Sequence, residues 1–267
     1  MKKPFLPVLM ALFAIGLLFC KSKETPVKTV APLKSESVRY SKRQCVDEAK
    51  GQCAEFNISY SVFSGGDSVV TAALNKSIQD YLLSAVGGDA QSPFAQALDT
   101  AGQHFVLMYL NDLKVNPDWV VGYSTEIKDT VPLLNSKVAT IQMDGYSFTG
   151  GAHPNPFGLL VSYDLTKGAK PLEITDLIRD TNAVRPALER AYKVLKGLKE
   201  TDPLGELVYP EIKQIPMPGN VGVAANGIRF FYNAYEIAPY AVGSSDVLLT
   251  WEQLGPLADK NRWTGEK

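Results

Sequence analysis

The sequence predicts an α+β fold, and three features of the chain lead to this prediction. Residues 54–143 read as one β-like segment, then two helical segments, then two further β-like segments. Residues 146–267 mix β-like and helical runs without a regular alternation, and the two parts meet near a loop rich in glycine and proline at 149–158. Because consecutive helices beside consecutive strands favour α+β over a doubly wound parallel sheet, we expect two adjoining subdomains, each an antiparallel sheet with packed helices.

The expected subdomains cover residues 45–145 and 146–267. A chain of 267 residues is long enough for two ordinary domains. Hydrophobic residues make up 45% of it and charged residues 21%, with a formal net charge of −1, which is an ordinary balance for a globular protein. Since a nucleic-acid-binding surface needs a basic face or stripe, we expect no nucleic-acid partner.

Residues 1–19 have the pattern of an export signal. Lys2 and Lys3 precede an uncharged apolar run from Phe5 to Phe19, and Cys20 ends it. The run is shorter than the roughly 20 residues of an ordinary membrane span, which favours a signal segment. A cysteine at this place resembles a bacterial lipoprotein signal, in which the cysteine is lipidated. A plain signal peptide and a short uncleaved anchor are the alternatives.

The residues after this signal are polar. Residues 21–37 hold two prolines and show no sustained hydrophobic period. We therefore predict a flexible tether over residues 20–44, which holds the folded part off a membrane. The expected location is the bacterial cell envelope, outside the cytoplasm, with a lipid anchor at the N-terminus.

Cys45 and Cys53 enclose a short segment of turn composition. In an exported protein, two cysteines this close form a disulfide more often than a metal site. No histidine-rich motif lies nearby to complete a zinc site. Two free thiols are the alternative, which an oxidising compartment disfavours. Cys20 is then the one cysteine left over, as lipidation requires.

The first subdomain begins with an alternating strand and two helices. Apolar spacing over residues 70–82 predicts a helix capped by Asp67 or Ser68. A second helix is expected to begin at Ser92-Pro93, with Ser92 as its cap. Residues 54–63 alternate between apolar and polar, which predicts a strand with one buried side. The residues expected on that side are Phe56, Ile58, Tyr60 and Val62.

Two β-like runs at 119–127 and 137–143 complete this half, with turn chemistry at Val131-Pro132. In the second half, a short return strand is expected at 172–174. A helix is expected over 183–199, because its apolar residues recur on one face. These residues are Val184, Leu188, Tyr192 and Leu195.

The last part of the chain is predicted mainly from its turns. Residues 200–220 are rich in proline and glycine and read as an irregular excursion. Asn226-Gly227 predicts a hairpin turn, followed by strands at 228–232 and 246–251.

The sequence contains no catalytic motif that we can assign. It lacks the nucleophile elbow, the zinc-protease helix motif, the P-loop and the dinucleotide fingerprint. Only His104 and His153 are present, so a site of three histidines is impossible. We therefore expect no metal or cofactor and propose no catalytic residues. His104 lies in a helix without a partner motif, and we interpret it as a surface or half-buried histidine.

Two loops with fixed shapes contain the candidate binding residues. The first holds His153 between glycines and prolines, and the second, residues 233–243, holds Tyr235, Glu236 and Tyr240. Loop tyrosines form binding surfaces at low entropic cost. The alternative is structural, with the histidine bonding backbone carbonyls, the tyrosine rings packing over the sheet end and Glu236 capping backbone donors.

These loops resemble the RsiV-like family of extracytoplasmic modules. The resemblance rests on residues 146–156 (YSFTGGAHPNP), 162–168 (SYDLTKG) and 231–243 (FYNAYEIAPYAVG). Residues 45–140 resemble the partner domain of the same family, which also precedes the catalytic domain of PdaC-type peptidoglycan deacetylases. The resemblance implies an α+β module without catalysis of its own, which in the RsiV case binds lysozyme.

Residues 1–267 contain neither an anti-sigma segment nor a deacetylase domain, so only the binding function carries over. We expect a non-catalytic envelope module that binds a lysozyme-like protein or a cell-wall ligand such as peptidoglycan. A peptidoglycan-acting enzyme without a recognisable motif and a structural envelope lipoprotein are the alternatives.

Overall fold

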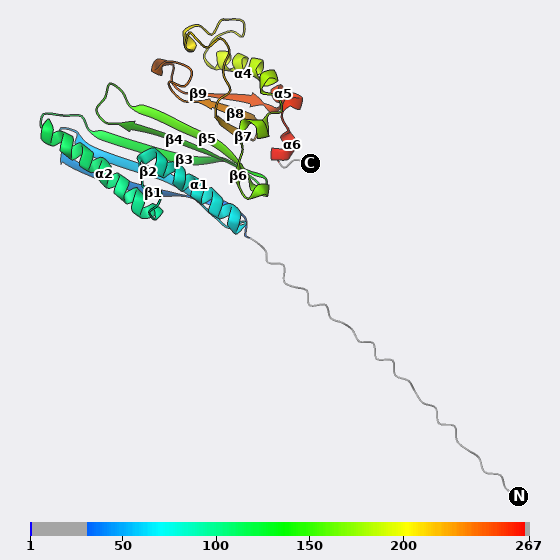
Figure 1. Cartoon of the computed structure of the whole chain (residues 1–267), viewed down its shortest axis with the longest axis horizontal. Coiled ribbons are helices and arrows are strands. Elements are labelled where there is room, and N and C mark those ends of the chain that lie inside the picture. The colour runs from blue at the N-terminus through cyan, green and yellow to red at the C-terminus, as the bar shows by residue number, and fades with distance from the viewer. Residues whose placement is uncertain (2–30, 265–267) are drawn as a thin grey trace. The chain divides into compact units, whose positions relative to one another are not determined.

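A nine-stranded sheet organises residues 31–264, which together with Met1 are the residues that this computed structural model describes. The strand order is β1-β2-β3-β4-β5-β7-β8-β9, and β6 pairs with the C-terminal end of β5 (Figure 1). Most neighbours are antiparallel, but β2 runs parallel to β3 and β5 parallel to β7. The strands are β1 (Lys34–Asp47), β2 (Gln52–Ser64), β3 (Tyr123–Leu134), β4 (Val138–Phe148), β5 (Asn155–Asp164), β6 (Lys170–Pro171), β7 (Asn220–Ala224), β8 (Gly227–Tyr232) and β9 (Ser245–Thr250).

The helices lie in two groups on opposite sides of this sheet (Figure 1). α1 and α2 pack against β2, whereas α4 packs against β9. The alpha and beta elements are grouped, not alternating, so the α+β class is confirmed. The described helices are α1 (Ser68–Val86), α2 (Phe94–Val115), α3 (Ile174–Leu177), α4 (Thr181–Leu195), α5 (Trp251–Leu254) and α6 (Lys260–Thr264).

β1 corrects the prediction of a tether that extends to residue 44. Residues 34–44 form most of this strand, which pairs antiparallel with β2 along its whole length. β1 lies at the edge of the sheet, and most of its side chains are exposed. An exposed edge strand needs no hydrophobic alternation, so its sequence does not differ from that of a polar linker. The rest of the predicted tether, residues 20–30, lies outside the described residues.

The sheet runs through the expected subdomain boundary at residue 145. That residue lies within β4, and β5 from the second range pairs with β4 from the first. Two large cores nevertheless form, besides a smaller cluster between the C-terminal half of α2 and strands β2 and β3. One packs α1 and α2 against β2 to β5, and the other packs α4 against β7 to β9. Alternate residues of β4 divide between them, with Val138 in the α4 core and Ala139 in the other.

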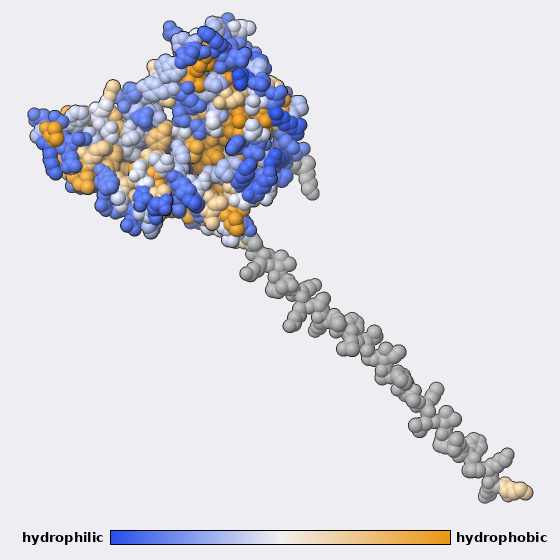
Figure 2. Space-filling view, in the orientation of Figure 1, coloured by the Kyte–Doolittle hydropathy of each residue, from blue (hydrophilic) through white to orange (hydrophobic). Residues whose placement is uncertain are grey.

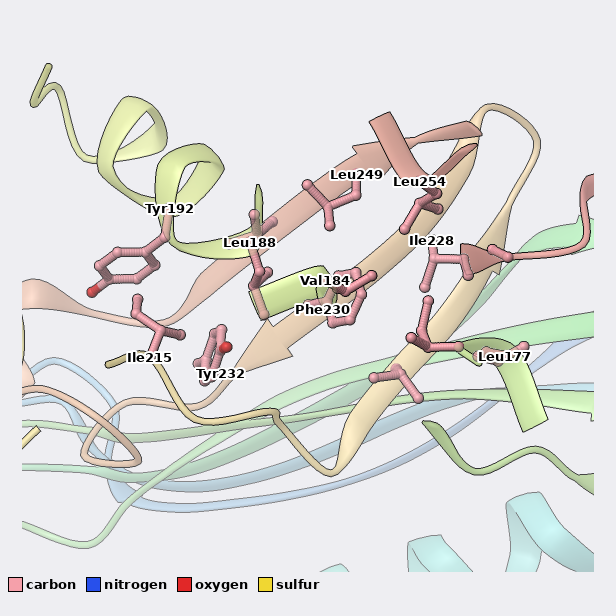
Figure 3. Packing of buried hydrophobic residues seen from close by; sticks show 14 of the residues in the cluster. Leu177, Val184, Leu188, Tyr192, Ile215, Ile228, Phe230, Tyr232, Leu249 and Leu254 are labelled. Atoms are coloured by element: carbon pink, nitrogen blue, oxygen red, sulfur yellow. The ribbon is translucent and has the colours of Figure 1, made fainter. Parts of the chain in front are cut away.

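The α4 core is shown in Figure 3, where side chains of the helix face those of β8 and β9. Val184, Leu188 and Tyr192 are buried there as predicted. Leu195 is 50% exposed, because the helix ends at that residue and not at 199. Tyr192 and Tyr232 meet edge to face, with ring centroids 6.2 Å apart.

Several local predictions differ from the structure by a residue or two. Asp67 caps α1, as expected, and its side chain accepts hydrogen bonds from Val69 N and Val70 N. α2 starts at Phe94 with Pro93 before it, and the Ser92 hydroxyl donates to Asp89 instead of capping the helix. The return strand is β6 at residues 170–171, not 172–174.

Two strand predictions were wrong in part. Val131-Pro132 lies inside β3, at a register shift between Thr130 and Leu133 that tolerates the missing proline N–H. In β2 the burial changes phase after Ile58, so that Ser61 and Phe63 are buried. The reason is tertiary, because Asp129 accepts hydrogen bonds from both the backbone and the hydroxyl of Ser61.

Candidate functional site

The topology brings the two candidate loops to the same end of the sheet. β5 runs parallel to β7, and β8 runs antiparallel to β7. The loop that follows β8 therefore lies at the end where β5 begins. This places residues 149–154, between β4 and β5, beside residues 233–244, between β8 and β9. We call the two loops together the aromatic loop surface.

His153 uses both of its ring nitrogens, one within its own loop and one to reach the second loop. Nδ1 lies 2.9 Å from the carbonyl oxygen of Pro154, and Nε2 lies 3.1 Å from the hydroxyl of Tyr235. A carbonyl oxygen can only accept, so Nδ1 carries the hydrogen and donates to Pro154. In the neutral ring Nε2 is then the acceptor, and the Tyr235 hydroxyl donates to it. This contact crosses the gap between the two loops.

The Tyr240 ring stacks on the His153 ring. Its centroid lies 3.7 Å from that of His153, with 16° between the two planes. Tyr235 lies 5.6 Å from Tyr240, centroid to centroid. Three of the four predicted binding residues thus form one aromatic cluster. Tyr235 is 49% exposed and His153 is exposed as well, so the cluster faces solvent.

Glu236 has a different role from these three residues. Its carboxylate accepts a hydrogen bond of 2.8 Å from the backbone N–H of Asn233, and the N–H of Glu236 donates to the carbonyl of Asn233. These two bonds close the turn that carries Tyr235. Tyr235 itself has a φ of 67°, in the left-handed region that disfavours residues with a Cβ. The turn therefore holds Tyr235 in an unfavourable backbone conformation that presents its ring beside His153.

Asn233 connects the second loop to the sheet, and the sequence did not single it out. Its Oδ1 accepts from Gly158 N at 2.6 Å, and its Nδ2 donates to Gly158 O at 3.1 Å. The side-chain amide thus imitates a strand pairing with β5. Gly158 is buried, and a Cβ there would lie 2.6 Å from the Phe231 ring. The one feature of the sequence that could have indicated this role is the position of Asn233 directly after a predicted strand.

Trp119 extends the aromatic loop surface toward the β1–β2 hairpin. A Cβ on Gly150, which has a φ of 84°, would lie 2.3 Å from the Trp119 ring, so glycine is required there. Val120 beside it is 59% exposed, and Val46 in the hairpin is 62% exposed. Figure 2 shows apolar surface at the end of the molecule where α2 finishes.

The predicted disulfide is present and closes this hairpin. Cys45 and Cys53 face each other in the β1–β2 register, with Cα atoms 4.0 Å apart, and their sulfurs are bonded. Cys20, the predicted lipidation site, lies outside the described residues. His104 is exposed on α2, in agreement with its interpretation as a surface histidine.

Within residues 31–264, no three histidine, cysteine, aspartate or glutamate side chains gather in a way that could hold a metal ion. The helices of that same range are all too short or too polar to cross a membrane.

The fold defines an α+β module, and its candidate site is the solvent-facing aromatic loop surface. Residues 48–156 match the family described as Deacetylase PdaC, and residues 175–252 match a family described as a protein of unknown function, DUF3298. The first match contains most residues of the α1–α2 core and the second most residues of the α4 core, and together they support a related module family. No curated protein matches the sequence.

Two solved structures share this architecture. One is a DUF3298-family member from Bacteroides fragilis, with a TM-score of 0.70 and 22% identity over 88% of this chain and 96% of that one. The other is a DUF3298-family protein from Pseudomonas aeruginosa, with a TM-score of 0.62 and 20% identity over 88% of this chain and 97% of that one. At these identities the likeness demonstrates the fold.

Proposed function

We propose that the protein is an extracytoplasmic binding module, anchored to a bacterial envelope membrane by a lipid on Cys20. Its ligand is a lysozyme-like protein or a cell-wall polymer, and the aromatic loop surface is its binding site. The observation that carries the proposal is the solvent-facing cluster of His153, Tyr235 and Tyr240, which two separate loops form together.

The chemistry of this cluster suits recognition better than catalysis. Tyrosine offers a large apolar ring and a hydroxyl with few rotatable bonds, so little entropy is lost on binding. Within the described residues, a carbonyl and a phenol occupy the two nitrogens of His153, so neither nitrogen bonds a carboxylate or a nucleophile there. Backbone hydrogen bonds and the Asn233 clamp hold the loops in place before any ligand arrives. Such preorganisation lowers the entropic cost of association.

The comparisons support the class of ligand. Matches to the DUF3298 and PdaC families suggest a cell-wall-related module. The resemblance of the two loops to the RsiV-like module points more specifically to lysozyme. Peptidoglycan is the substrate of lysozyme, so either ligand places the protein in the same surroundings.

The test is to measure binding of lysozyme and of purified cell wall to the wild type and to Tyr235→Ala. An interface anchor of this kind contributes about 2 kcal/mol or more to affinity. Tyr235 is 49% exposed, so only about half of its surface is buried, and losing that contact costs about 1 kcal/mol of stability. We expect a clear loss of affinity with a small decrease in the melting temperature.

Tyr60→Ala is the matched control. Tyr60 is a half-buried tyrosine on β2 whose ring packs edge-on against Phe94, with centroids 5.4 Å apart. It lies away from the aromatic loop surface, so this variant should lose stability and keep its affinity. Equal affinities of wild type and Tyr235→Ala would remove the loop surface from the binding site. Turnover of peptidoglycan by the wild type would favour the enzyme alternative.

The anchor is tested separately. Metabolic labelling with a fatty-acid analogue should tag the wild type and leave Cys20→Ala unlabelled. Equal labelling of the two proteins would contradict the lipoprotein assignment without affecting the binding proposal.

A further inference from the structure

A second candidate site lies on α4, where charged side chains surround a hollow of about 650 Å³. None of its residues belongs to the aromatic loop surface. Helix residues form one wall, and residues from the irregular excursion before β7 form the other. The lining residues are Asn182, Arg185, Pro186, Glu189, Arg190, Lys193, Glu200, Lys213 and Gln214.

The charges in this hollow do not balance. Its lining includes four cationic and two carboxylate side chains. Lys193 lies 3.0 Å from Glu189, and Arg190 lies 3.8 Å from Glu200, so both carboxylates already have a cation. Lys213 donates to a backbone carbonyl, that of Pro210, at 2.7 Å.

Arg185 is the cation without a partner. Its Nε is shielded from solvent and makes no hydrogen bond to any residue that the structure describes. Burial of Nε leaves the guanidinium only partly hydrated, and its other N–H groups are the donors available to an acceptor that enters the hollow. Burial raises the pKa of the Tyr232 phenol, and the Arg185 charge acts in the opposite direction.

We propose that this hollow binds an oxyanion, a phosphate or carboxylate group of a hydrophilic ligand, with Arg185 as its main donor. A guanidinium presents several N–H donors in one plane, which suits either group. Lys213 supplies a second positive charge from the opposite wall. The side-chain amides of Asn182 and Gln214 supply neutral donors at the rim. The site is independent of the proposed lysozyme or cell-wall binding.

The experiment is isothermal titration calorimetry of the full chain in detergent with two probes, inorganic phosphate and citrate. Hydrogen bonds to a charged group are strong enough that Arg185→Gln should weaken binding about tenfold or more. Arg39→Gln is the matched control, because Arg39 is exposed on β1 and the substitution removes the same charge. It should bind as the wild type does.

Lys213→Gln covers the case in which Arg185→Gln does not fold. Lys213 is exposed, so its loss should weaken binding without loss of structure. Binding of phosphate alone assigns the site to phosphate-bearing ligands, binding of citrate alone assigns it to carboxylates, and binding of both supports the shared oxyanion chemistry. If neither probe binds, the proposal is overturned, and it is also overturned if Arg39→Gln loses as much affinity as Arg185→Gln.

Discussion

Ser162→Ala should destabilise the protein by about 2 kcal/mol, because it leaves a buried backbone N–H without an acceptor. β5 and β7 meet at a single bridge, Val161 with Val221, so few backbone bonds join the two parts of the sheet. Side-chain hydrogen bonds provide further links between the two parts. Val223 N donates to Ser162 Oγ at 2.8 Å, and Thr140 Oγ1 donates to Val223 O at 2.7 Å.

The two hydroxyls also bond each other, at 2.7 Å. Because Thr140 uses its hydrogen on the Val223 carbonyl, Ser162 donates to Thr140. Thr140 and Ser162 are both fully buried, at 0% exposure. No water therefore replaces the serine oxygen without rearrangement. An unsatisfied buried donor costs about 1–3 kcal/mol, and 2 kcal/mol lowers the melting temperature of a protein of this size by roughly 4–8 °C.

Urea unfolding measures the loss, and hydrogen exchange at the Val223 amide locates it. Exchange of that amide should become faster in Ser162→Ala. Ser37→Ala is the matched control, because Ser37 is exposed on β1, and the change should stay within about 0.5 kcal/mol of the wild type. Thr140→Val completes a double-mutant cycle, for which residues in one network show a coupling of about 0.5–3 kcal/mol. A Ser162→Ala variant as stable as the control, or strictly additive effects, would refute this account of the junction.

Three further predictions concern separate parts of the fold. The Cys45–Cys53 disulfide closes a loop of sequence separation 8, and its reduction should lower the free energy of unfolding in urea by about 2–3 kcal/mol. Intact mass after alkylation without reductant should show that neither cysteine is modified. Burial raises the pKa of Asp129 above its ordinary value of 3.8, and the Ser61 hydrogen bonds act against this. The folded state therefore binds the proton more tightly, so this carboxyl stabilises the fold at low pH and loses that contribution as pH rises through the raised pKa. The free energy of unfolding of the wild type, relative to that of Asp129→Asn, should fall as pH rises through the raised pKa of Asp129. A difference that does not change with pH would contradict this prediction. Tyr235→Gly should be about 1 kcal/mol more stable than Tyr235→Ala, because glycine accepts the left-handed backbone that alanine does not; equal melting temperatures would show that the turn is not strained.

The sequence determined the features that depend on neighbours along the chain. The α+β class, the cap of α1 by Asp67, the buried face of α4 and the hairpin near Asn226 all follow from local spacing and turn chemistry. The disulfide followed from the short distance between two cysteines in an exported chain. The two loops of the candidate surface were recognisable because glycine and proline restrict the backbone locally.

Only the tertiary structure decided how distant segments meet. β1 has the composition of a linker, and pairing with β2 makes it a strand. The Asn233 clamp reaches Gly158 across 75 positions, and the His153 contact reaches Tyr235 across 82. Ser61 is buried against Asp129 of the neighbouring strand, and the Arg185 Nε is shielded without an acceptor among the described residues. Such contacts depend on strand register and on the path of the chain through space, and neither is encoded in the spacing of adjacent residues.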